Sequence, residues 1–207
     1  RAVHAPRHVV YWTDLILSAG IGYSAMAVAV RTTSPAVAAV SATVSALALY
    51  RGVSFIHEIT HIKDDLLKGF RLGYNVLIGV PILIPSFMYE GVHSLHHSKT
   101  RYGTVEDPEY LPFARMNPGV MLGSVALAAL APVGLVLRFG VLTPVSYLSP
   151  SFRRTVLARF TALSINPQFR RQLVPAEMPR SWKLTELAAS AWAVTVIFLI
   201  ASGAVSL

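Results

Sequence analysis

Three long apolar stretches constrain the fold of this chain more than any other feature. They cover residues 9–30, 36–56 and 184–207, and each has about the ~20 residues that a helix needs to cross a bilayer. Tyr11 and Trp12 lie near the start of the first stretch, where aromatic side chains meet the membrane surface. The sequence therefore predicts an all-α integral membrane protein, a helical bundle with about three clear spanning helices.

Composition excludes several functional classes. Hydrophobic residues make up 54% of the 207 residues and charged residues only 14%, which is unlike a soluble domain. The chain has no cysteine, so it forms no disulfide, no thiolate metal site and no cysteine nucleophile. The formal net charge is +8, but the basic residues are scattered between apolar segments. We therefore expect membrane lipids as partners and no nucleic acid.

Two further apolar stretches, residues 72–88 and 118–142, are each broken by proline. The flanking regions 51–71 and 143–183 carry four and seven Lys or Arg residues, which favours the cytoplasm for both regions. Segments between two cytoplasmic regions cross the membrane an even number of times or not at all. We therefore predict that both stretches form interfacial or re-entrant helices on the cytoplasmic face.

Five of the seven histidines fall in two tight clusters. His57 and His61 form the first, just beyond the second apolar stretch, and His93, His96 and His97 form the second. Histidines three or four residues apart share one face of a helix, and neutral imidazole is the commonest protein metal ligand. We therefore predict that all five histidines bind metal at a shared site on one side of the membrane.

The segment His57-Glu58-Ile-Thr-His61 also matches the zinc protease signature, in which both histidines bind zinc and the glutamate is the general base. An intramembrane protease of this kind needs a further carboxylate ligand on another membrane helix. The later apolar segments offer only Glu186, and the second histidine cluster would have no role. A zinc protease therefore stays an alternative.

The two clusters, written as His-x-x-x-His and His-x-x-His-His, resemble the histidine boxes of the membrane fatty acid desaturase and hydroxylase superfamily. The segments Pro81-Ile-Leu-Ile-Pro85 and Arg101-Tyr-Gly-Thr-Val-Glu-Asp-Pro-Glu-Tyr110 look like those of bacterial members. The resemblance implies that the clustered histidines hold two iron ions, which activate dioxygen on the cytoplasmic side and desaturate a fatty acyl lipid. It also implies a location in the bacterial inner membrane and an electron donor such as a ferredoxin or a cytochrome.

Chemistry supports iron but leaves other functions open. Breaking an unactivated C–H bond needs a redox metal, and zinc has no redox chemistry. A ligand set made of imidazoles suits iron without excluding copper or zinc. A lipid or carotenoid hydroxylase on the same scaffold is the alternative to a desaturase, and a membrane protein that binds metal without turnover is a third interpretation.

Ligating histidines usually donate their second N–H to a carboxylate or a carbonyl. Asp65 lies four residues after His61, and Glu90 lies three residues before His93. On continuous helices these acids would share a face with the histidines, so we expect Asp65 and Glu90 to orient the ligands. The segment 107–109, Asp-Pro-Glu, is predicted to be a turn that ends before the next helix.

Several arginines lie in the basic region 143–183. We predict that they contact lipid headgroups, and the alternative is that they dock an acidic electron carrier. These residues are Arg153, Arg154, Arg159, Arg170 and Arg171.

The superfamily pattern is incomplete in this chain. Members carry a third histidine box after two further spanning helices, whereas this sequence has no histidine after His97. Five imidazoles are too few for two iron sites, and the chain begins with Arg1 rather than methionine. We therefore expect residues 1–207 to form a single membrane desaturase-like domain that lacks its C-terminal part, a fourth spanning helix and the third box.

Overall fold

The computed structural model describes residues 6–111 and 116–204. Those residues form helices, turns and loops, and no strand occurs among them. The predicted all-α fold is therefore confirmed. The contacts divide the chain into two compact units, with the boundary between Ser86 and Phe87.

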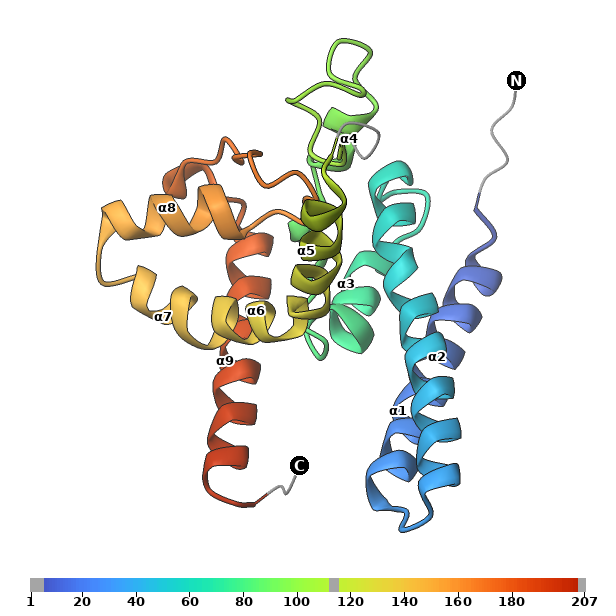
Figure 1. The fold of residues 1–207 in the computed structure, drawn as a ribbon. Coiled ribbons are helices and arrows are strands. Elements are labelled where there is room, and N and C mark those ends of the chain that lie inside the picture. The colour runs from blue at the N-terminus through green and yellow to red at the C-terminus, as the bar shows by residue number, and fades with distance from the viewer. Residues whose placement is uncertain (1–5, 112–115, 205–207) are drawn as a thin grey trace. The chain divides into compact units, whose positions relative to one another are not determined.

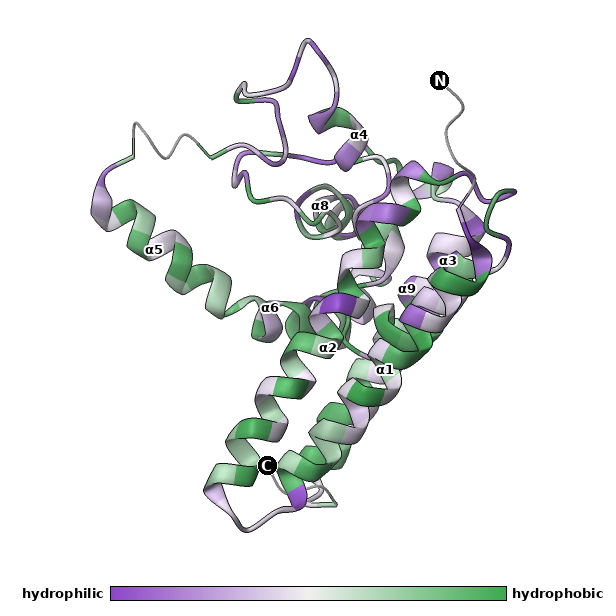
Figure 2. Cartoon of the chain, turned by 90° about the vertical axis from the view of Figure 1, so that its right-hand side faces the viewer, coloured by the Kyte–Doolittle hydropathy of each residue, from purple (hydrophilic) through white to green (hydrophobic). Residues whose placement is uncertain are grey.

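The first unit is built on an antiparallel helical hairpin (Figure 1). Helix α1 spans His8–Arg31 and helix α2 spans Pro35–His61. The Ser34 side chain accepts a hydrogen bond from the Val37 N–H, and a proline at the first helical position suits the start of α2. Both helices are apolar along most of their length (Figure 2), and each contains an 18-residue stretch that is apolar enough to cross a membrane. Two of the three predicted spanning helices are thus confirmed by length and composition.

Small residues let this unit pack closely. A Cβ atom added at Gly22 would lie 2.6 Å from a side-chain carbon of Leu49, and one added at Gly52 would lie 2.6 Å from a side-chain carbon of Ile78. Both distances are shorter than real Cβ contacts, so a larger residue would push the neighbours away. Membrane helices associate through such close approach because lipid removes the hydrophobic driving force between them.

The stretch 72–88 folds into short helical turns rather than one long helix. Helix α3 spans Phe70–Tyr74, and a π-helical turn, η1, spans Asn75–Gly79. The Asn75 amide closes the loop that follows, because it donates to the Ser86 hydroxyl at 3.0 Å and accepts from the Ser86 N–H at 2.8 Å. Buried polar groups of the loop are paired in this way.

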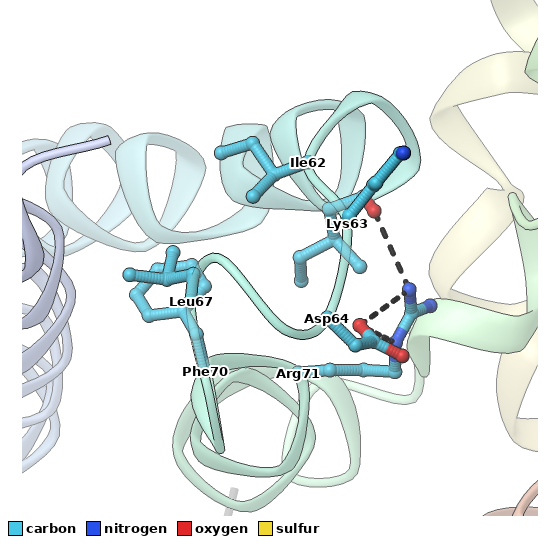
Figure 3. A pocket seen from close by; sticks show the side chains of 7 residues that line it. Ile62, Lys63, Asp64, Leu67, Phe70 and Arg71 are labelled. Atoms are coloured by element: carbon cyan, nitrogen blue, oxygen red, sulfur yellow. Dashed lines mark hydrogen bonds and ion pairs between the residues drawn. The ribbon is translucent and has the colours of Figure 1, made fainter. Parts of the chain in front are cut away.

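The chain leaves α2 through a short loop that is fastened by Arg71 (Figure 3). The Arg71 guanidinium donates to the Asp64 carboxylate at 3.0 Å and to the Ile59 carbonyl at 3.4 Å. Together with Leu67 and Phe70, these residues line a cavity of about 10 Å³, which has room for a single water molecule. The loop therefore turns away from α2 directly after His61, and Arg71 connects it to the last turn of the helix.

The second unit gathers short helices around one long helix. Helix α9 spans Arg180–Ala201 and contains an 18-residue stretch that is apolar enough to cross a membrane. It matches the third predicted spanning stretch, although it begins four residues earlier and ends at Ala201. The other helical elements described in this part of the chain are η2 (Ser86–Met88), α4 (His93–His96), α5 (Pro118–Ala129), α6 (Ala131–Leu137), η4 (Arg138–Leu142), α7 (Thr143–Ser146), α8 (Pro150–Phe160) and η5 (Pro175–Glu177).

The helical region after residue 117 is bent rather than straight. Helix α5 and the helical run 131–146 meet at an angle of 52°. Pro132 lies just after the bend, where its missing N–H cannot continue the helical hydrogen bonds. The bend agrees with the re-entrant segment predicted for residues 118–142, and a broken span has the same geometry.

A buried ion cluster joins α9 to the helices before it. Glu186 is fully buried, and its carboxylate accepts hydrogen bonds from Arg138 at 2.6 Å and from Arg153 at 3.1 Å. Arg138 also donates to the hydroxyls of Thr143 and Thr161. Taking charges out of water is costly, and these pairings offset much of that cost.

This packing corrects one sequence prediction. Arg153 and Arg171 cannot contact headgroups or dock an electron carrier, because both side chains are buried. Arg154, Arg159 and Arg170 are exposed and keep those predicted roles.

Candidate metal centre

The first histidine cluster lies on the last two turns of α2. His57 and His61 are four residues apart, so their rings lie on one face of the helix, with centroids 4.6 Å apart. Both residues are exposed. The helix itself sets this spacing, in line with the sequence prediction.

Glu58 and Glu186, the acids of the zinc protease alternative, each bond to other side chains. The Glu58 carboxylate accepts a hydrogen bond from the Tyr11 hydroxyl at 3.1 Å. Glu186 is enclosed by Arg138 and Arg153, to which both of its oxygens are bonded. A zinc ligand needs an oxygen that is open to the metal, so the protease alternative loses its carboxylate ligand.

The second cluster lies on and directly after α4, which is a single helical turn. His93 is buried, and its Nε2 lies 2.9 Å from the Nε2 of His97. Two ring nitrogens that bind one ion at about 2.0–2.1 Å lie about 3 Å apart when the angle at the ion is roughly 90°. The spacing of this pair therefore fits a shared metal ion.

Two carboxylates lie within hydrogen-bond distance of the Nδ1 atoms of His93 and His96. The Glu109 carboxylate lies 2.7 Å from the Nδ1 of His93, and both Asp107 oxygens lie 3.0 Å from the Nδ1 of His96. Because a carboxylate oxygen accepts hydrogen bonds, these contacts favour the tautomers of His93 and His96 that carry the proton on Nδ1, and the Tyr89 hydroxyl also lies 2.8 Å from the Nδ1 of His93. The Nε2 atoms are then left as the ligand atoms, which is the arrangement found around many protein metal ions.

Asp107 is almost fully buried, and its surroundings keep it ionised. Burial raises the pKa of its carboxyl group, but hydrogen bonds from the N–H groups of Gly103 and Glu109 and from His96 outweigh that effect and leave the pKa below its usual value. Sequence reasoning treats this segment as a turn and misses both carboxylates. The signal that could have revealed them is a pair of acids flanking a proline shortly after a histidine cluster.

The carboxylates predicted from helical spacing lie elsewhere. Helix α2 ends at His61 and α4 begins at His93, so neither Asp65 nor Glu90 shares a helix with its histidine. Asp65 is exposed in the loop after α2, and the Glu90 carboxylate accepts a hydrogen bond from the Trp182 indole at 2.9 Å. The premise of a continuous helix is therefore wrong, and a role for these two acids at the metal stays a prediction.

An open cavity of about 500 Å³ lies beside the second cluster. Its volume is in the range of small-molecule sites, and it combines hydrogen-bonding and apolar side chains. The residues that line it are Tyr89, His96, Glu109, Leu163, Ser164 and Ile165.

The fold and the sequence patterns define a helical membrane protein with two histidine clusters, each a candidate for metal binding. The family model described as fatty acid desaturase matches residues 32–207. The chain therefore belongs to the fatty acid desaturase family, which is part of the superfamily that its histidine clusters resemble.

The chain is also similar to a ceramide hydroxylase of Caulobacter vibrioides (strain NA1000 / CB15N), with 46% identity over 200 residues. The aligned part covers 97% of this chain and 57% of the relative, so the chain spans little more than half the length of that curated protein. No solved structure matches the chain. The hydroxylase alternative fits this relative better than the predicted desaturation does.

Proposed function

We propose that this chain is the histidine-box part of an oxygen-dependent lipid hydroxylase whose substrate is a ceramide or a similar lipid. The observation that carries the proposal is the 46% identity to a ceramide hydroxylase over 97% of the chain, a length that includes both histidine clusters. In this reaction one oxygen atom of dioxygen enters a C–H bond. The other is reduced to water by two electrons from a carrier and two protons.

The proposed metal is iron, and its proposed ligands are the clustered histidines. Iron bound there would supply the redox chemistry that oxygenation of an unactivated C–H bond requires. The donor set fits, because the ligand atoms are imidazole nitrogens, and the Nε2 atoms of His93 and His97 lie 2.9 Å apart. The five proposed ligands are His57, His61, His93, His96 and His97. We further propose that the full-length protein completes two iron sites with a third histidine box after a fourth spanning helix.

The chain's own residues would orient the ligands and receive the lipid. Asp107 and Glu109 would hold the protons on the Nδ1 atoms of His96 and His93. In the cavity next to them, Leu163 and Ile165 provide an apolar wall, and the Ser164 hydroxyl lies among the polar groups. Such a mixed lining suits an amphiphilic molecule.

We propose that the centre faces the cytoplasm of a bacterial inner membrane. The basic region 143–183 supports this orientation through the excess of Lys and Arg on cytoplasmic loops. The electron donor would be a ferredoxin or a cytochrome. Its proposed docking residues are now Arg154, Arg159 and Arg170, because these are exposed.

Lipid profiling of cells that express the full-length gene tests this proposal. Wild-type cells should contain ceramides that have gained one oxygen atom. His96→Ala should reduce these products to background, because it removes the imidazole that Asp107 orients. His8→Ala is the matched control, since His8 is exposed at the start of α1, and it should keep the product. Wild-type and His96→Ala cells with identical lipid profiles would contradict the proposal.

Desaturation is the second candidate function, and the description of the matching family favours it. The same profiles separate the two reactions, because a desaturase removes two hydrogens from an acyl chain and adds no oxygen. Acyl chains with a new double bond and no hydroxylated ceramide would therefore favour the desaturase.

A further inference from the structure

The segment after α8 bonds to the main chain on both sides of the second histidine cluster. Residues 161–171 form this segment, called the clamp segment below. Two of its polar residues, Asn166 and Arg171, are buried with 8% of their surface exposed. Each donates hydrogen bonds to main-chain carbonyls, so both residues hold the backbone near the cluster.

Asn166 fastens the loop that carries the two carboxylates. Its side-chain amide donates to the Val105 carbonyl at 2.8 Å and to the Asp107 carbonyl at 2.9 Å. Its side-chain oxygen accepts from the Gln168 N–H at 2.9 Å, which fixes the orientation of the amide. One side chain thus fixes the backbone at the point where Asp107 turns toward His96.

The next carbonyl of that loop is held just as closely. The Pro108 carbonyl accepts from the Ser164 hydroxyl at 2.6 Å and from the N–H groups of Ile165 and Asn166 at 3.1 Å each. This carbonyl lies between Asp107 and Glu109. The clamp segment therefore holds the backbone between the two residues whose side chains orient the histidines.

Arg171 fastens the other side of the cluster. Its guanidinium donates to the carbonyls of Phe87 and Thr161 at 2.8 Å each, and also to the carbonyl of Glu90. Two of these carbonyls lie in the short segment that leads into His93. The carbonyl groups are buried and need donors, so the guanidinium satisfies them while tying this segment to the clamp segment.

We propose that Asn166 is a positioning residue for the metal centre. By fixing the backbone around Asp107 and Glu109, it keeps one carboxylate on His96 and the other on His93, and so selects the tautomer with Nε2 open to metal. A four-residue helix does not hold such a geometry by itself, because helix nucleation is unfavourable. The inference rests on the proposed function only in taking iron as the metal that the open Nε2 atoms bind.

Nitrogen-15 NMR of the full-length protein, labelled at histidine and freed of metal, tests the proposal. In the wild type, His93 and His96 should carry their protons on Nδ1. Asn166→Ala should give His96 a mixture of tautomers and should weaken cobalt(II) binding about tenfold, the size of effect known for residues that support metal ligands. Asn117→Ala is the matched control, because it removes the same side chain at the start of α5, and it should change neither readout.

An Asn166→Ala protein that unfolds at a lower temperature but keeps the wild-type tautomers and cobalt affinity would overturn the proposal, since the residue would then be only structural. If that variant does not fold, Ser164→Ala removes only the hydroxyl of the same clamp segment that bonds to the Pro108 carbonyl at 2.6 Å and to the Asn166 carbonyl at 3.2 Å. It should shift the His96 tautomers in the same direction by a smaller amount, and an unchanged spectrum would also overturn the proposal. A wild type with the expected tautomers but no metal binding would contradict the proposed function and support the positioning role.

Discussion

The two histidine clusters reach their geometry by different means. The first lies at the end of a 27-residue helix, where a spacing of four residues is enough to bring two rings together. The second lies on and next to a four-residue helix, and its ring orientations depend on carboxylates and on a clamp segment from later in the chain. The geometry of the first cluster is therefore local, and that of the second cluster depends on tertiary packing.

Removal of Glu186 should give the largest difference in stability between the regions that carry the two clusters. Glu186→Ala leaves Arg138 and Arg153 buried without their counter-charge, a change that costs about 3–5 kcal/mol. Because α8 carries Arg153 and leads into the clamp segment, the second cluster should loosen while the α1–α2 hairpin stays folded.

Hydrogen exchange followed by mass spectrometry checks this prediction. The comparison is with Glu177→Ala, which removes an exposed glutamate from the same unit and should leave exchange unchanged. Equal loss of protection in the hairpin and in the second cluster would show that the contrast between them is wrong.

Asp107→Asn should give a smaller but more specific effect. The substitution keeps the shape of the side chain and removes the charge that holds the proton on His96, so metal affinity should fall by about 10- to 100-fold. Glu58→Gln is the comparison at the first cluster. The Glu58 carboxylate accepts a hydrogen bond from Tyr11, but it lies 3.8 Å from the Nδ1 of His57, beyond hydrogen-bond distance and exposed to solvent, so this variant should alter affinity little. Cobalt(II) titration of both variants measures the difference. Equal losses of affinity would mean that the first cluster also depends on a carboxylate.

The fold could be predicted largely from the sequence because a bilayer leaves few choices. An apolar run of about 20 residues must pair its own backbone groups, and a helix does so. The helices α1, α2 and α9 therefore follow the predicted stretches closely. The arrangement of the candidate ligands could be predicted only where it depends on local spacing, as for the rings of His57 and His61.

The rest of the site depends on contacts that sequence spacing does not report. Asp107 meets His96 across 11 residues through a loop that is held by the clamp segment. Arg153 and Arg154 are adjacent and identical in type, yet one is buried and the other exposed. Only the first meets Glu186, 33 residues further along the chain, and no local pattern distinguishes the two arginines.

The metal content of the full-length protein, purified without chelators, tests the central claim most directly. We predict bound iron in excess of zinc and copper. The iron should be kept by His8→Ala and lost from both His61→Ala and His93→Ala, because we propose that each cluster contributes ligands to the centre. Zinc in place of iron, or an iron content that neither cluster variant changes, would contradict the claim.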